Sequence, residues 1–123
     1  MSKWLLRIAS LYLVIGVCFG IVMGATHNFL QAPVHAHLNL LGWVTLGMVG
    51  LLYTVRPEYA DTGLAKAHFV LHNLGLPVMM GALFYELQGV QAAGPVLGAG
   101  SLVVGVGIAC LALNIWRVSG RSA

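Results

Sequence analysis

Charged side chains are scarce in this sequence. Only 7% of its 123 residues are charged, whereas 59% are hydrophobic, and an ordinary soluble domain carries about 25% charged residues. Too few charges are present to cover a water-facing surface, which predicts a chain embedded in a lipid bilayer. The net charge of +3 comes from six scattered Lys and Arg residues. They form no basic patch, and we expect no nucleic-acid partner.

Cysteine is also rare. Cys18 and Cys110 each lie in the middle of an apolar run, and neither belongs to a CxxC motif. This pattern predicts buried free thiols and excludes both a disulfide framework and a cysteine zinc motif.

Long apolar segments make up most of the sequence. Each has the roughly 20 residues that a helix needs to cross a hydrocarbon core about 30 Å thick. They predict an all-α integral membrane four-helix bundle, with residues 1–123 forming one domain. The expected helices cover residues 8–25, 34–55, 67–87 and 95–116.

Positive charge is distributed asymmetrically among the segment ends. The linkers at residues 26–33 and 88–94 contain no charged residue. If both termini are cytoplasmic, every basic residue falls on the cytoplasmic side, as the positive-inside rule requires. We therefore expect a bacterial inner-membrane protein with both termini in the cytoplasm. The basic residues are Lys3, Arg7, Arg56, Lys66, Arg117 and Arg121.

Glycine is abundant, with sixteen residues. Gly16, Gly20 and Gly24 form two consecutive GxxxG steps, a spacing that lets two helices approach closely. The stripe predicts either packing within the bundle or a homo-oligomer, a dimer or a trimer, joined through these three residues.

Five histidines stand out because ionisable side chains at membrane depth are costly and usually functional. His68 and His72 are four residues apart and share one helix face, a spacing suited to two ligands of one metal or to a haem ligand with a neighbour. His35 and His37 are about 200° apart on a helix and would point in different directions unless the helix begins near His37. We predict these four residues as cofactor ligands, with His27 completing the five.

One stretch carries a recognisable motif: HLNLLGW at 37–43, then Gly47, Gly50, Tyr53, Pro57 and Glu58. It resembles helix II of the catalytic subunit of haem–copper oxidases, most closely the nitric oxide reductase branch, with one residue deleted between Leu41 and Trp43. The similarity covers about 22 residues and implies that His37, on the outer side, is an axial ligand of haem b. Four helices cannot supply the oxygen-reducing centre of that family. The resemblance therefore implies a miniature relative that serves in electron transfer with a quinol or cytochrome partner, or in binding NO or O2.

The depths of the histidines present a difficulty for a haem with two histidine ligands. In straight helices, His37 would lie about 28 Å above Arg56, and His72 only about 14 Å above Gly63. The expected mismatch of about 15 Å is too large for one flat macrocycle. Either the second helix starts deeper, or the pairs serve two sites, or the haem is shared between protomers.

Two other functions remain open. His27, His35, His37 and Glu86 are all expected near the outer side, and they could form a copper, non-haem iron or zinc site. Alternatively, the chain is an assembly or structural subunit of a respiratory oxidase, in which the histidines only form hydrogen bonds. No residue stands out as catalytic.

Overall fold

The computed structural model describes residues 1–120, which are almost entirely helical. The second spanning helix, Ala32–Val55, is continuous but changes type twice, from α2 through the π-helical segment η1 to α3. All four spanning helices of the described part are long and apolar enough to cross a membrane. In order, the elements are α1 (Ser2–Thr26), α2 (Ala32–His37), η1 (Leu38–Thr45), α3 (Leu46–Val55), η2 (Pro57–Tyr59, a short 3₁₀ turn), α4 (Gly63–Glu86) and α5 (Ala93–Ser119).

The predicted number and order of the helices are confirmed, but most of the observed helices are longer than the apolar segments. Helix α1 already begins at Ser2, so it includes Lys3 and Arg7, and α5 continues past Arg117. Hydropathy detects the part of a helix that suits hydrocarbon, whereas backbone hydrogen bonding continues into the interfacial region.

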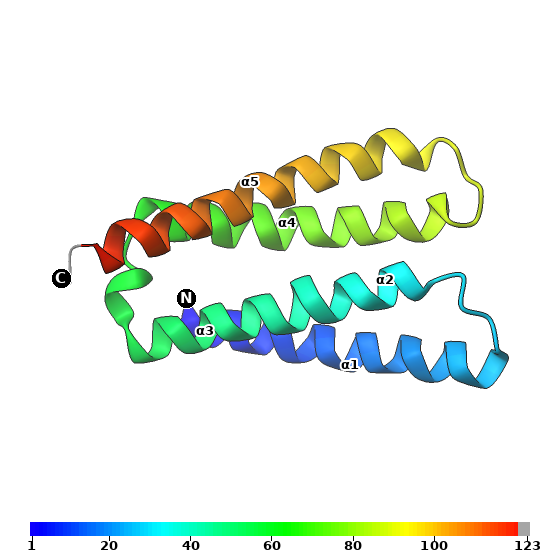
Figure 1. Ribbon diagram of the computed structural model, residues 1–123, viewed down its shortest axis with the longest axis horizontal. Helices are drawn as coiled ribbons and strands as arrows, with labels where there is room; N and C mark the ends of the chain where they lie inside the picture. The colour runs from blue at the N-terminus through cyan, green and yellow to red at the C-terminus, as the bar shows by residue number, and fades with distance from the viewer. Residues whose placement is uncertain (121–123) are drawn as a thin grey trace.

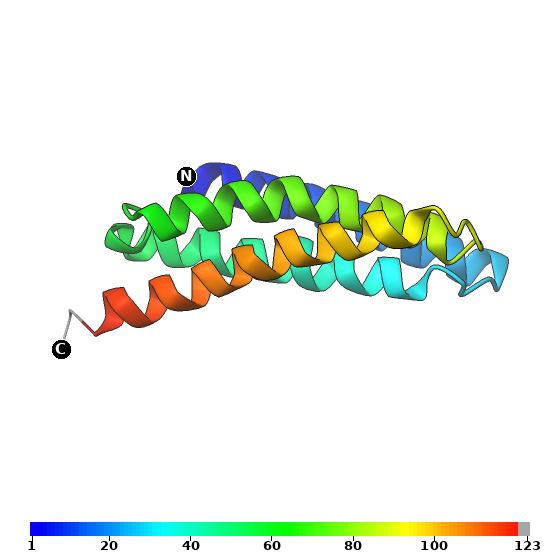
Figure 2. The same cartoon turned by 90° about the horizontal axis from the view of Figure 1, so that it is seen from above.

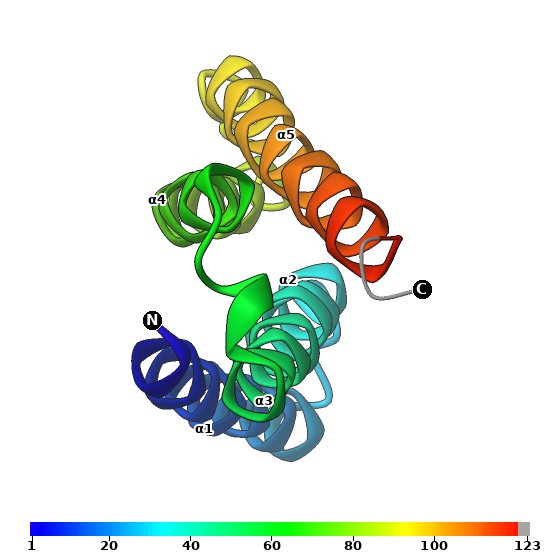
Figure 3. The same ribbon diagram turned by 90° about the vertical axis from the view of Figure 1, so that its left-hand side faces the viewer.

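The helices form two antiparallel hairpins. Helix α1 pairs with the second spanning helix and α4 pairs with α5, whereas the contacts between the hairpins are sparser (Figure 1). The view along the bundle shows the two pairs side by side (Figure 3), and α5 crosses the bundle obliquely (Figure 2). Each hairpin is therefore the tightly packed unit.

Glycine sets the close approach within the second hairpin. A Cβ atom added at Gly100 would lie 3.0 Å from the backbone nitrogen of Met79, and one at Gly75 would lie 2.9 Å from the side chains of Val103 and Val104. Backbone atoms cannot move aside as a side chain can. A side chain would therefore be tolerated less well at Gly100 than at Gly75.

The chain termini and the α3–α4 connection lie at the same end of the bundle (Figure 1). The basic residues of α1, α4 and α5 belong to the helix ends that meet there, and Arg56 follows α3; Arg121 lies outside the described residues. In the connection, Arg56 forms an ion pair with Glu58. A backbone hydrogen bond, together with Arg56, holds the pKa of Glu58 below its usual value.

Candidate functional site

Each of the four predicted histidine ligands has one ring nitrogen hydrogen-bonded to a backbone carbonyl. A carbonyl oxygen can only accept, so that ring nitrogen must carry the proton. The other nitrogen of a neutral ring then holds a lone pair. Metal-binding histidines usually have this arrangement, because the hydrogen bond fixes the tautomer and the ring orientation.

His35 points toward α1. Its Nδ1 donates to the carbonyl of Gly16 over 2.8 Å, and its Cε1 would lie 3.0 Å from a Cβ placed on Gly20. Asn39 packs against Gly16 in the same way, so these two glycines accommodate polar side chains of their own chain. A Cβ at Gly24 would meet nothing within 4 Å, which leaves Gly24 free for a contact with another protomer.

His37 points elsewhere and does not form a pair with His35. Its Nδ1 donates to the carbonyl of Pro33, 2.7 Å away and one turn earlier. The ring is partly exposed. The Nε2 lone pair is therefore held on a ring that can be approached from outside the bundle.

His68 and His72 come together in the interior. Both are fully buried, and their ring centroids are 5.0 Å apart. Nδ1 of His68 donates to the carbonyl of Gly107 over 3.1 Å, and Nε2 of His72 donates to that of Leu41 over 3.0 Å. The remaining nitrogens, Nε2 of His68 and Nδ1 of His72, are buried and have no hydrogen-bond partner. The predicted pairing of these two residues on one face is confirmed.

The π-helical segment supplies one of these anchors. Leu41, whose carbonyl accepts from His72, lies within η1. Segments of π-helix are rare and often occur at functional sites. Here η1 provides the hydrogen bond that links the second spanning helix to α4 near the middle of the bundle.

The same hydrogen bond shows that the expected depth mismatch was wrong. His72 lies level with Leu41, which is one turn, about 6 Å, from His37, rather than about 15 Å. The buried Tyr59 lies in the connection between α3 and α4.

The remaining predicted metal ligands lie at the end of the bundle opposite the α3–α4 connection. His27 is exposed at the C-cap of α1 in a left-handed conformation, and Glu86 is exposed at the end of α4. Over residues 1–120, no three His, Cys, Asp or Glu side chains are grouped so that they could hold a metal ion. One chain therefore does not assemble the site of His27, His35, His37 and Glu86.

Sequence reasoning missed a polar cluster at the connection between α3 and α4. The buried Asn114 of α5 donates to the carbonyl of Tyr59 over 2.8 Å and accepts from the hydroxyl of Thr62 over 2.6 Å. Thr62 also caps α4 by accepting from the amide of Ala65. An asparagine near the end of an otherwise apolar helix was the signal available in the sequence.

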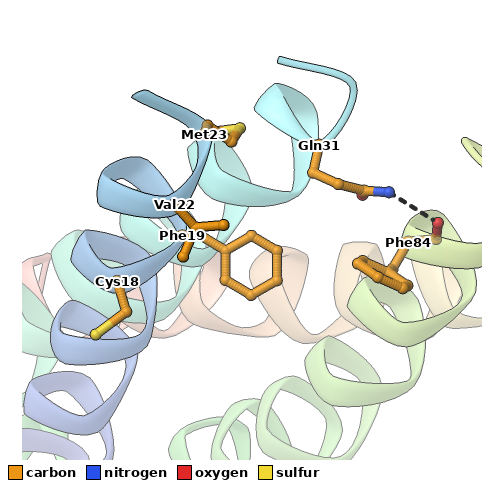
Figure 4. Close-up of a pocket in the computed structure, with 6 residues that line it drawn as sticks. All are labelled: Cys18, Phe19, Val22, Met23, Gln31 and Phe84. Carbon is orange, nitrogen blue, oxygen red and sulfur yellow. Dashed lines mark hydrogen bonds between the residues drawn. The ribbon is translucent and has the colours of Figure 1, made fainter. Parts of the chain in front are cut away.

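A pocket of about 350 Å³ lies between α1 and α4, at the end of the bundle opposite the α3–α4 connection (Figure 4). Its walls are mainly apolar, and the amide of Gln31 bridges it by donating to the carbonyl of Phe84 over 3.2 Å. The pocket includes none of the histidines, and its chemistry suits a hydrocarbon chain. Its lining residues are Cys18, Phe19, Val22, Met23, Gln31 and Phe84.

Comparisons with known protein families, curated proteins and solved structures find no match to this chain. The arguments for function therefore rest on the imidazoles and their surroundings.

Proposed function

We propose that this chain is a b-type haem protein of the membrane, and that Nε2 of His37 is an axial ligand of the haem iron. The observation that supports it is the hydrogen bond from Nδ1 of His37 to the carbonyl of Pro33. This bond leaves the Nε2 lone pair on a partly exposed, oriented ring, as in haem proteins with a histidine ligand.

The other imidazoles suit a macrocycle less well. The ring of His35 rests against Gly20 of α1. His68 and His72 are fully buried among helices, so a flat ring about the size of a haem could reach them only if those helices separated. His37 is also the residue on which the resemblance to haem–copper oxidase helix II places the axial ligand.

The proposed orientation puts both termini in the cytoplasm and His37 near the outer face of a bacterial inner membrane. The uncharged outer linkers and the basic residues at the opposite end support it. Haem at this level would exchange electrons with a quinol or an outer cytochrome, or would bind a diatomic gas such as NO or O2. This chain's part is to hold the iron through His37 and to fix that ring through Pro33.

Within residues 1–120, His37 is the one residue of each chain that we propose as an axial ligand. In a homo-oligomer, a second copy would supply the other ligand and give six-coordinate, low-spin iron. In a monomer, the second position would be open to a gas. The form of the spectrum separates these two cases, because low-spin reduced haem b has sharp, split α and β bands.

The test is the absorption spectrum of the protein purified from its native membrane, together with its iron content. We expect a Soret band in the wild type. In His37→Ala we expect the haem to be lost or to become high-spin. The exposed His27→Ala is the matched control and should leave the spectrum unchanged, as should His72→Ala. An unaltered spectrum in His37→Ala would exclude His37 as the ligand.

A colourless, iron-free wild-type protein would contradict the haem proposal itself. The chain would then be better described as an assembly or structural subunit, whose imidazoles only link helices, or as a protein that binds a non-haem metal. Analysis for copper and zinc on the same sample distinguishes these two alternatives.

A further inference from the structure

The interior pair, His68 and His72, is not used by the proposed haem site. Its two unpartnered nitrogens are acceptors in an apolar environment, and no donor or charge from the described residues compensates them. A buried polar group without a partner destabilises the fold. Two such atoms one helical turn apart require an explanation.

We propose that Nε2 of His68 and Nδ1 of His72 together bind one monovalent copper ion, Cu(I). The inference is independent of haem at His37, because the two sites share no residue. Copper would take the place of the missing donor, and the carbonyls of Gly107 and Leu41 would hold the two rings in the required tautomers.

The spacing of the rings is compatible with one ion bound by both residues. A metal–imidazole bond is about 2.0 Å long, which puts the ion about 3 Å from each ring centre. Ring centroids up to about 6 Å apart can therefore share an ion, and these are 5.0 Å apart. The two residues also project from the same face of α4, as side chains four residues apart on a helix do.

The charge and number of the ligands favour Cu(I) over a divalent ion. Both ligands are neutral, and no third His, Cys, Asp or Glu of the described residues joins them. The cost of burying an ion rises with the square of its charge, so a divalent ion would cost about four times as much as a monovalent one. Zinc also prefers four ligands, whereas Cu(I) accepts as few as two.

The first test uses the full chain in nanodiscs without oxygen, with Cys18→Ser and Cys110→Ser to remove the competing thiols. Cu(I) is supplied from a chelator buffer, and nitrogen-15-labelled histidine is followed by NMR, since Cu(I) is diamagnetic. We expect one equivalent of Cu(I) to shift the nitrogen-15 signals of His68 Nε2 and His72 Nδ1. The signals of the two protonated nitrogens should not change. Shifts confined to His35 or His37, or no shift at all, would overturn the proposal.

Substitution provides the second test. His72→Leu and His68→Leu should each weaken Cu(I) binding at least ten-fold, because even the loss of a supporting hydrogen bond weakens metal binding about 10–100-fold. The matched control His27→Ala should bind as the parent does. Unchanged affinity in the His68→Leu/His72→Leu double variant contradicts the proposal. Because the NMR experiment needs no histidine substitution, misfolding of these variants cannot decide the outcome.

Discussion

Asn114 shows how one residue can hold distant segments together. Its amide connects α5 to Tyr59 and Thr62 of the connection between the hairpins. In an apolar environment such hydrogen bonds have little competition from water, and leaving the partners unpaired is costly.

We therefore expect Asn114→Leu to destabilise the protein by about 1–3 kcal/mol, because the hydroxyl of Thr62 and the carbonyl of Tyr59 lose their partner. Unfolding in mixed detergent micelles, followed by circular dichroism, measures the change. Ser101→Ala is the control on the same helix: Ser101 is exposed and bonds only to its own helix, at Leu97. Equal stability of Asn114→Leu and Ser101→Ala would show that the cluster contributes nothing.

The histidines illustrate what residue spacing can and cannot predict. The i, i+4 spacing correctly brought His68 and His72 together, and the i, i+2 spacing predicted that His35 and His37 diverge within a helix. Helix α2 begins at Ala32, with Pro33 in its first turn, so both residues are helical and do diverge. Which carbonyl each ring meets depends on neighbouring helices, and spacing along one helix contains no such information.

At the scale of helices, the α4–α5 contact depends on the absence of a side chain at Gly100. We expect Gly100→Ala to destabilise the protein by about 1–3 kcal/mol, since the new methyl would press on the Met79 backbone. Gly105→Ala is the matched control on α5, where a Cβ meets nothing within 4 Å. It should be neutral or stabilising by up to about 1 kcal/mol, because alanine favours helix. The same unfolding measurement tests this prediction. A loss of stability in Gly100→Ala that is no larger than in Gly105→Ala would contradict it.

The π-helical segment could not be predicted from the sequence. The second spanning helix has apolar side chains on most of its faces. Its hydrophobic pattern therefore does not distinguish 3.6 residues per turn from a wider helix. The predicted helix order followed from segment length alone, because hydrocarbon thickness sets that length. The hydrogen bonds that Asn114 makes to Tyr59 and Thr62 did not follow, because they depend on segments far apart in the sequence.

At the scale of the whole molecule, the two hairpins form a bundle with one basic end and one end without Lys or Arg. The connections at residues 27–31 and 87–92 contain no Lys or Arg, whereas the connection between α3 and α4 begins with Arg56. Basic residues are retained on the cytoplasmic side during insertion. The end without Lys or Arg, where His37 lies one turn from Pro33, is therefore expected to face outward.

Fusions made in a bacterial host test this orientation. Alkaline phosphatase is active only outside the cytoplasm, so we expect activity when it follows Gly89 and none when it follows Asp61. Green fluorescent protein, which fluoresces only when it folds in the cytoplasm, should give the opposite pattern at these two positions and should fluoresce at the C-terminus. Phosphatase activity after Asp61, with none after Gly89, would invert the topology. It would also place His37 on the cytoplasmic side, out of reach of an outer electron carrier.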